Sequence, residues 1–497
     1  MSAHSASDMS IKSDNSNVYS CNKTRWWTPR LAGPVIAAAV IRFTLLAVAL
    51  SRGGVNNLID SATGHYLDPG RNLLLHGRFF ANGVPDLLRT PGYSLFIAVT
   101  SLAGLPAAAA ANVILSVFSV ILVWRLGRAV LGDDRIALGA AWIFAFEPIS
   151  IIYSVFLVSE PLFLTLFLLS MERLAEFLRG RRLPVLAVAG LWLATATFVR
   201  PITYYLPFAL AVGLFVVLAR VPDLRWKAPA VLLISVLPWL AAWQVRNWVE
   251  TGYRGFSSIS EINLFFYVAP GITAQIEHRY IYDVLTASGY PNFRDLWIDN
   301  HGQIYLSPTY LALHPEQAAW SQGQRLAFMR SESTHVIRTH YGVYLHMCLI
   351  STFRTLFEVG AGRFEVLLNR HGPYHIVGLA KDKGMAREVI ELFNAYPWVA
   401  AEKAAFAVVL LGLYLFAARG VFRIGMHNTY LWLLLGISLY IIAVSAVATG
   451  PLGEARYRLP VMPVVCIFAA AGFWRINQPR DITVAATPIG STEFTQS

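Results

Sequence analysis

Charged residues are scarce in this chain. Asp, Glu, Lys and Arg make up only 14% of its 497 residues, whereas 56% are hydrophobic. The mean hydropathy is +0.51, which lies far outside the range of soluble proteins and indicates a polytopic membrane protein. The net charge of +11 does not indicate nucleic acid, because Lys and Arg cluster at the ends of apolar runs. A positive-inside topology and anionic membrane lipid account for that charge.

Several motifs of soluble enzymes are missing. There is no Walker motif and no Gly-x-Ser-x-Gly elbow, which argues against nucleotide hydrolysis and against a serine nucleophile. The three cysteines, Cys21, Cys348 and Cys466, are far apart and define neither a disulfide framework nor a metal site. His335 and His340 are five residues apart, a spacing that does not place them on one helix face for zinc.

Apolar runs of the length that crosses a bilayer as a helix occur ten times. They cover residues 31–50, 109–128, 136–152, 155–176, 184–200, 203–219, 228–246, 399–418, 428–447 and 457–474. We therefore predict an all-α membrane protein with about ten or more transmembrane helices. The shorter run between Pro91 and Pro106 is expected to be re-entrant or to lie at the interface.

Basic residues at the ends of the runs predict the orientation. Four clusters, within 125–135, 173–182, 220–227 and 419–423, are expected to face the cytoplasm. The predicted organisation is a disordered cytoplasmic tail (1–30), a seven-span module (31–246) with a first outer loop (51–108), an outer loop element (247–398), C-terminal transmembrane helices (399–475) and a cytoplasmic tail (476–497). Within the outer element, 341–360 is predicted to be an amphipathic interfacial helix, with an additional span as the alternative.

Under this topology the outer loops collect carboxylates and arginines at membrane level, where charges are costly unless they pair or serve a site. The set comprises Asp60, Asp68, Arg89, Glu147, Glu160, Arg200, Arg246, Glu261, Glu454, Arg456 and Arg458, together with Asn247 and Asn263. For single residues a structural role is the alternative: Glu160 would pair with a nearby arginine, and Arg200 and Arg246 would snorkel to the interface. The concentration of the whole set on one side favours a functional site.

Short motifs in this set occur in an order that resembles a known superfamily. They are DS (60–61), HYL (65–67), RNLL (71–74), GRF (77–79), RTPGY (89–93), SEPLF (159–163), VRP (199–201), PW (238–239), RNW (246–248) and EARYRLP (454–460) with Pro463. This ordered set resembles the bacterial GT-C glycosyltransferases, the relatives of protein O-mannosyltransferases and of the lipid A aminoarabinose transferase. The likeness covers most of 31–475 and is weakest in 265–398. Many members carry an adjacent acidic pair in the first loop, whereas Ser61 follows Asp60 here.

The resemblance implies a polyprenyl-phosphate-sugar donor, an acceptor that is a glycan, lipid or protein, and a bacterial inner-membrane enzyme whose active site faces the periplasm. An acceptor hydroxyl needs a base, and Asp60 suits that role if its aromatic neighbours dehydrate it and raise its basicity. Arginines suit the leaving phosphate. The implied roles are catalysis by Asp60 and Glu160, donor binding by Arg89, Arg200, Arg246, Arg456 and Arg458, and acceptor or sugar binding by Tyr66, Tyr93, Glu261 and Asn263. A divalent cation on Asp60 and Glu160 is left open.

Two other classes of function compete with this interpretation. A transporter or flippase of a lipid-linked saccharide would use the same cavity without chemistry, although such proteins often show internal repeats and none is detected here. A non-catalytic membrane scaffold accounts for the hydrophobicity but not for the charged set. A polymerase or ligase of lipid-linked glycans stays close to the main hypothesis.

Overall fold

The computed structural model describes residues 27–60, 62–370, 394, 396–425 and 428–474. Nearly all of the predicted N-terminal tail and the whole of the predicted C-terminal tail lie outside the described residues. Within the described part, the chain is helical apart from irregular connections and one antiparallel hairpin, β1 (Phe80–Ala81) with β2 (Val84–Pro85).

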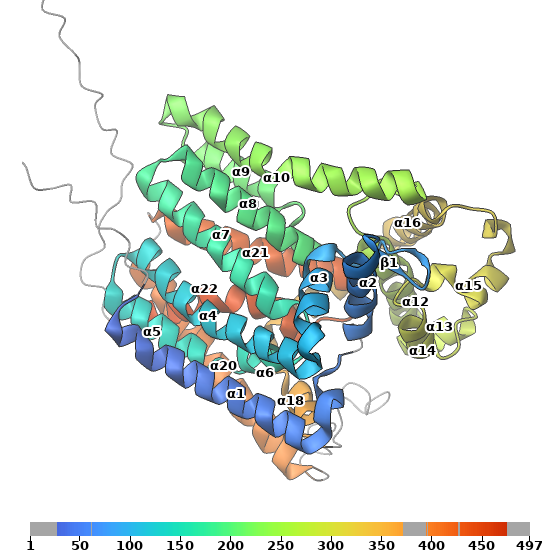
Figure 1. Ribbon diagram of the computed structural model, residues 1–497, viewed down its shortest axis with the longest axis horizontal. Coiled ribbons are helices and arrows are strands. Elements are labelled where there is room, and N and C mark those ends of the chain that lie inside the picture. Colours follow the sequence, from blue (N-terminus) through green and yellow to red (C-terminus); the bar gives the residue numbers. More distant parts are fainter. Residues whose placement is uncertain (1–26, 61, 371–393, 395, 426–427, 475–497) are drawn as a thin grey trace, which may run out of the picture.

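Long apolar helices lie side by side in a bundle (Figure 1). They are α1 (Ala32–Gly53), α4 (Leu105–Leu131), α5 (Asp134–Ala145), α6 (Pro148–Val155), α7 (Glu160–Gly180), α8 (Leu183–Val199), α9 (Leu206–Val217), α10 (Pro222–Thr251), α20 (Pro397–Ile424), α21 (Thr429–Thr449) and α22 (Met462–Phe473). A 3-10 segment, η9 (Ala455–Val461), leads into α22. Each of the ten predicted runs falls on one of these helices or on a bent pair of them.

Length and composition qualify fewer of these helices as membrane spans. Among the described residues, six helices are long and apolar enough to cross a membrane, or seven if the bent pair α5–α6 is one span. The predicted runs at 184–200 and 203–219 form α8 and α9, which are 17 and 12 residues long. Helix α7 is long enough, but its last three turns carry Glu172, Arg173, Glu176 and Arg179. Ten or more spans is therefore not confirmed.

The bend between α5 and α6 has a local cause. The two helices meet at 53°, and Pro148 begins α6 without an amide hydrogen to donate back to α5. The carboxylate of Glu147 caps α6 by accepting the backbone N–H groups of Ile149 (3.1 Å) and Ser150 (2.5 Å). Glu147 thus has a structural role.

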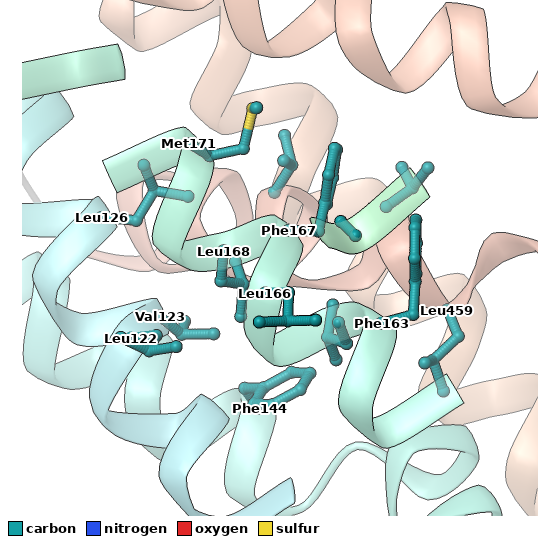
Figure 2. Close-up of a cluster of buried hydrophobic side chains, with 14 of the residues drawn as sticks. Leu122, Val123, Leu126, Phe144, Phe163, Leu166, Phe167, Leu168, Met171 and Leu459 are labelled. Carbon is teal, nitrogen blue, oxygen red and sulfur yellow. The ribbon is translucent and has the colours of Figure 1, made fainter. Parts of the chain in front are cut away.

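Side chains between α4 and α7 form the centre of the bundle. Leu122, Val123 and Leu126 of α4 lie on one side of α7, and the rings of Phe163 and Phe167 lie on another side (Figure 2), all within one buried cluster. Phe144 of α5 and Leu459 of η9 close the same cluster. Because α7 is packed on several sides, its first residue, Glu160, is held rigidly at one end of the bundle.

Short helices gather at that end (Figure 1). They are α2 (Thr63–His76), α3 (Pro91–Thr100), α11 (Ile259–Asn263), α12 (Ala269–Ile276), α13 (Ile281–Ala287), α14 (Phe293–Asp299), α15 (Pro308–Leu313), α16 (Gln322–Thr339), α17 (Tyr341–Phe357) and α18 (Ala361–Leu367). Helices α11 and α13 to α16 share a buried cluster around Phe266 and Tyr305 that also contains Leu87 and Leu88 from the first predicted outer loop. The two predicted outer segments therefore pack on each other.

Residues 341–360, predicted to be an amphipathic helix or a further span, contain the 17-residue helix α17. Its exposed face carries Tyr341, Leu345, Leu349, Phe353 and Phe357, whereas Met347 and Ser351 are buried against the bundle. The helix is thus two-sided, with apolar groups on the face that the protein leaves uncovered.

Candidate active site

A cavity of about 2030 Å³ lies where α7 and η9 begin and where α8 and α10 end. Eight of the predicted site residues line it: Asp60, Tyr66, Arg89, Glu160, Arg200, Glu261, Asn263 and Arg456. The volume exceeds that of a pocket for one drug-sized molecule, so there is room for two substrates.

Asp60 is positioned by hydrogen bonds between two connections of the bundle. Its backbone N–H donates to Thr63 Oγ1 (2.9 Å), and that hydroxyl donates to the carbonyl of Leu157 (3.0 Å). The N–H of Leu157 donates in turn to the carbonyl of Leu58 (2.9 Å). The segment that carries Asp60 is therefore bonded to the segment that leads into Glu160.

Glu160 begins α7, directly after the non-helical stretch 156–159. Asn112, buried within α4, donates from Nδ2 to the carbonyls of Phe156 (2.9 Å) and Val158 (3.2 Å), which holds this stretch in place. The Glu160 carboxylate is 3% exposed and forms an ion pair with Arg200, just beyond the end of α8. A carboxylate in the first turn is also favoured by the helix dipole.

Charges alternate along the cavity wall from Asp60. Arg363 Nη1 lies 2.6 Å from Asp60 Oδ2, and its Nη2 lies 4.0 Å from Glu454 Oε2. Arg456 Nε lies 3.0 Å from the same Glu454 oxygen. Segments around positions 60, 363 and 455 thus meet in one network of two carboxylates and two arginines.

This network determines the charge state of Asp60. Burial favours the neutral acid, but the charges of Arg363 and Arg456 and the N–H of Ala62 outweigh it and hold the pKa of Asp60 below its usual range. The prediction that dehydration raises the basicity of Asp60 is therefore wrong, because an arginine far along the chain pairs with this carboxylate. Asp60 is ionised at neutral pH and is a weaker base than expected.

Arg89 reaches the cavity beside Asp60. It donates from Nη1 to the hydroxyl of Tyr66 (3.2 Å), and its guanidinium carbon lies 4.5 Å from the centre of that ring. Its Nη2 lies 3.3 Å from His65 Nδ1, and burial, together with the charge of Arg89, lowers the pKa of His65 to about 2. His65 is therefore neutral. Arg89 forms no ion pair within the described part of the chain, so its charge adds to the field of the cavity.

Glu261 and Asn263 line the cavity from α11. Glu261 is 2% exposed, forms an ion pair with Arg330 of α16 and accepts a hydrogen bond from the hydroxyl of Tyr253 (2.9 Å). The Arg330 side chain is 61% exposed, so this pair presents its cationic side to solvent.

Positive charge prevails in the cavity. The lining contains nine arginines (Arg89, Arg200, Arg254, Arg279, Arg294, Arg330, Arg354, Arg363 and Arg456) and five carboxylates (Asp60, Glu160, Glu261, Glu358 and Glu454). Such an excess of guanidinium groups, which can bind phosphate bidentately, suits an anionic ligand.

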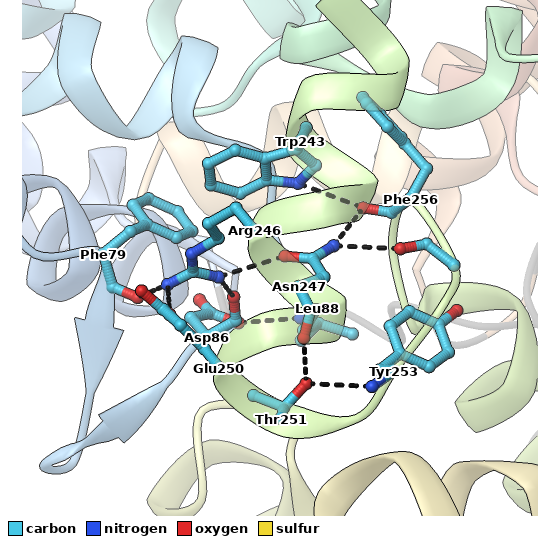
Figure 3. A network of polar contacts seen from close by, with 11 residues as sticks. Phe79, Asp86, Leu88, Trp243, Arg246, Asn247, Glu250, Thr251, Tyr253 and Phe256 are labelled. Atoms are coloured by element: carbon cyan, nitrogen blue, oxygen red, sulfur yellow. Dashed lines mark hydrogen bonds and ion pairs between the residues drawn. The ribbon is translucent and has the colours of Figure 1, made fainter.

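Arg246, predicted to bind the donor, does not line the cavity. It donates to the carbonyls of Phe79 (2.8 Å) and Asp86 (3.2 Å) and pairs with Glu250 (2.7 Å), as Figure 3 shows. It thereby fastens the β1–β2 hairpin to α10. Its role is structural, because the carbonyl oxygens of the hairpin occupy its donors.

Arg458 and Tyr93 are likewise absent from the cavity lining. Arg458 is 2% exposed and donates to the carbonyls of Thr355 (3.1 Å) and Glu358. In the 3-10 segment η9, with about three residues per turn, positions two apart point to different sides, so Arg458 cannot follow Arg456 into the cavity. Tyr93 is fully buried, accepts a hydrogen bond from Asn112 (3.1 Å) and packs edge-on against Tyr66.

The residues present do not fit a divalent cation. No group of three or more His, Cys, Asp or Glu side chains that could hold a metal ion occurs among the described residues. Both carboxylates considered for this purpose, Asp60 and Glu160, already face arginines, whose charge repels a second cation. We therefore derive no step through a metal.

Arg363 and Arg330 are among the lining residues that sequence reasoning missed, and they pair with the predicted Asp60 and Glu261. Both lie in 265–398, where the resemblance is weakest, and no motif surrounds either of them. The only available signal was an arginine in a mixed polar stretch, and arginines are too frequent in this stretch to identify a partner.

Comparisons with known proteins find similarity among solved structures. No family model matches the chain, and no curated protein matches it. Among solved structures, it is similar to the oligosaccharyltransferase AglB from Archaeoglobus fulgidus in complex with an inhibitory peptide and a dolichol-phosphate (14% identity, 89% of this chain, 50% of AglB, TM-score 0.41). It is also similar to ArnT from Cupriavidus metallidurans bound to undecaprenyl phosphate (13% identity, 89% of this chain, 78% of ArnT, TM-score 0.35).

Both neighbours are GT-C membrane glycosyltransferases, the superfamily that the sequence motifs resemble. The chain spans about half the length of AglB. Because the TM-scores are below 0.5, neither family membership nor activity is inferred from this likeness.

Proposed function

We propose that this protein is an integral-membrane glycosyltransferase that moves a sugar from a polyprenyl-phosphate donor to a nucleophile, such as a hydroxyl group, of an acceptor outside the cytoplasm. The observation that carries the proposal is the convergence of Asp60, Glu160, Arg200, Arg363 and Arg456 on one cationic cavity at the end of apolar helices. A lipid phosphate needs both an apolar bundle for its chain and cationic groups for its head.

The arrangement of charges along the helices supports an outward-facing cavity. Helix α7 begins in the cavity and ends near Arg179, whereas α8 begins after Arg182 and ends in the cavity. Helix α10 begins among Arg225 and Lys227 and also ends there. Basic clusters thus lie at the ends remote from the cavity, as the positive-inside rule expects for the inner membrane of a bacterium.

The chemical step is a single displacement at the anomeric carbon. The acceptor oxygen forms a bond to this carbon, its proton passes to the ionised carboxylate of Asp60, and the bond to the phosphate oxygen breaks. Attack from the face opposite the leaving group inverts the configuration. Arg363 holds Asp60 in its ionised form, and Glu160, fixed by Arg200, orients the acceptor.

The leaving group needs positive charge more than a strong base. The departing lipid phosphate gains negative charge, and Arg456, Arg200 and Arg89 are fixed around the cavity before the reaction starts. Such preorganised charge lowers the barrier because no side chain has to reorient during the step.

Asp60→Asn tests the proposal, because it keeps the shape of the side chain and removes the proton acceptor. With the purified protein, radiolabelled polyprenyl-phosphate sugar and an envelope acceptor fraction, loss of this group should lower the rate by about 10² to 10⁴. Asp68→Asn, which alters a carboxylate of the same loop that does not line the cavity, is the matched control. Near wild-type transfer by Asp60→Asn would refute the mechanism.

The transporter hypothesis predicts a different outcome. A transporter would move the lipid-linked saccharide across a proteoliposome membrane without forming a new glycosidic bond. Such movement by the wild type, with no transfer to any acceptor fraction, would replace the proposed function.

A further inference from the structure

Aromatic side chains form one wall of the cavity. Tyr267, Tyr280, Tyr282, Phe293 and Trp297, carried by or adjoining α12 to α14, all line it. Phe293 is 3% exposed and supports the others: its ring centre lies 5.6 Å from that of Tyr267 and 6.4 Å from those of Tyr282 and Trp297. Tyr280 and Tyr282, 5.2 Å apart, are 40% and 38% exposed. We call these five residues the aromatic wall.

The aromatic wall begins beside the charged network. Burial raises the pKa of Tyr267 above its usual range, and neighbouring tyrosines and Glu454 raise it further. Arg456 acts in the opposite direction, so both charged residues lie close enough to influence this ring. The Trp297 ring lies 5.8 Å from the ring of His65, which in turn contacts Arg89. A molecule lying on this wall can therefore place one end near the proposed reaction centre.

The backbone beneath the wall is also unusual. Residues Leu264–Val268 form one turn of π-helix between α11 and α12. Such turns are uncommon and occur often at functional sites, where they redirect side chains. Here the turn carries Tyr267 and follows Asn263, and both of these side chains line the cavity.

We propose that the aromatic wall binds a glycan acceptor, an inference that rests on the proposed function and names its substrate class. Sugar rings present apolar C–H faces and a polar rim, and tyrosine and tryptophan match both. The ring spacings are comparable to the length of one pyranose unit. Arg294 and Arg279 border the wall, although Arg279 also pairs with Glu277 (2.9 Å). The cationic groups of the cavity therefore favour acidic substituents on the glycan.

A peptide acceptor fits this wall less well. Extended peptides are commonly held by main-chain hydrogen bonds to the edge of a sheet. Neither strand of the hairpin, the one sheet within the described residues, contributes to the cavity lining. The polar groups next to the wall are side chains, which suit hydroxyl and carboxylate groups of a saccharide.

Binding can be measured apart from catalysis. Saturation-transfer NMR on the full-length protein in nanodiscs would compare a uronic acid heptasaccharide, maltoheptaose and an acidic heptapeptide. We expect binding in the order uronic acid heptasaccharide, maltoheptaose, peptide. Tyr282→Ala and Trp297→Ala should each weaken saccharide binding by about tenfold, the upper range for loss of one stacking ring.

Matched variants keep the test independent of folding. Tyr282→Phe retains the ring and should bind the saccharides within about twofold of the wild type. Trp226→Ala removes an exposed tryptophan at the opposite end of α10 and should leave binding unchanged. If Tyr282→Ala binds like Tyr282→Phe, if the peptide binds most tightly, or if the wild type binds neither saccharide, the proposal is overturned.

The two proposals fail separately. Asp60→Asn should lose transfer and keep saccharide binding. Saccharide binding without any transfer by the wild type would support the aromatic wall and refute the enzyme. Transfer to acceptors that do not depend on Tyr282 or Trp297 would support the enzyme and overturn the wall.

Discussion

Replacing Arg363 by Gln should raise the pKa of Asp60 and shift the acid side of the activity profile to higher pH. The Asp60 side chain is 3% exposed, and its Oδ2 lies 2.6 Å from Arg363 Nη1. In the variant, Asp60 keeps the N–H of Ala62 at 3.0 Å and the charge of Arg456. Burial is unchanged and is the largest influence on this carboxyl, so its pKa must rise.

The size of the shift follows from the contact. An opposite charge in direct contact typically lowers a carboxyl pKa by about 1 to 3 units. The Arg363 side chain is 32% exposed, and solvent screens part of its charge. The pKa of Asp60 should therefore rise in the variant, but by less than it would after loss of a fully buried partner.

The ion pair of Asp60 stabilises the fold at neutral pH and ceases to do so in acid. In the wild type the lowered pKa keeps Asp60 ionised, and its ion pair stabilises the fold above the unfolded-state pKa, with that contribution lost as pH falls through the folded-state pKa. In Arg363→Gln this contribution is missing at neutral pH, so Tm should fall. The acid-side loss of activity should also move to higher pH, because the base is protonated earlier.

The assay is the pH dependence of kcat/KM for glycosyl transfer. Arg363→Gln should lose activity on the acid side at a higher pH than the wild type and recover in part under alkaline conditions. Arg363→Lys keeps the charge and should resemble the wild type in this respect. Arg330→Gln, which removes the arginine partner of Glu261 elsewhere in the cavity, should leave the acid limb unmoved. Coincident acid limbs for Arg363→Gln and the wild type would contradict the role given to this pair.

Three further predictions concern residues around the site. Arg456→Lys should raise KM for the lipid donor about tenfold or more, because Lys cannot bind phosphate bidentately. Arg458→Lys should instead lower Tm and leave the donor KM unchanged. An equal rise in donor KM for both variants would contradict these separate roles. Asn112→Leu should destabilise the fold by about 1 to 3 kcal/mol and lower kcat, since two carbonyls before Glu160 lose their donor, and unaltered kcat would argue against that positioning. Burial raises the pKa of Asp86 to about 6, so the contribution of its neutral form to the stability of the fold is lost as pH rises through that value. Asp86→Asn should therefore raise Tm relative to the wild type at pH 8 and not at pH 4. A difference in Tm that does not depend on pH would refute this.

Local properties made much of the fold predictable. Each of the ten apolar runs corresponds to helix, because the period and length of an apolar segment depend only on neighbouring residues. The bend before α6 likewise follows from adjacent residues, since Pro148 cannot donate an amide hydrogen and Glu147 caps the next turn. The number of spans was less predictable, because short helices and charged helix ends do not meet a criterion based on length and hydropathy.

The sequence predicted which group of residues lies near the candidate site, but not the role of each residue in it. Eight of the eleven predicted residues line the cavity, since charges that flank apolar helices are confined to the ends of a bundle. Arg246 and Arg458 flank apolar runs just as Arg456 does, yet they donate to backbone carbonyls. The direction in which each arginine side chain points depends on how its helix or 3-10 segment is rotated relative to the neighbouring helices. The identity of the residue does not determine that rotation.

By itself, the sequence determined a helical chain with apolar runs and a concentration of carboxylates and arginines between particular runs. Only the tertiary structure decided that Arg363, 303 residues from Asp60, pairs with it and lowers its pKa. The physical reason is range: hydrophobicity and helix formation are set by residues a few positions apart, whereas the charge state of a buried carboxylate is set by whichever cation the packed helices bring within a few ångströms.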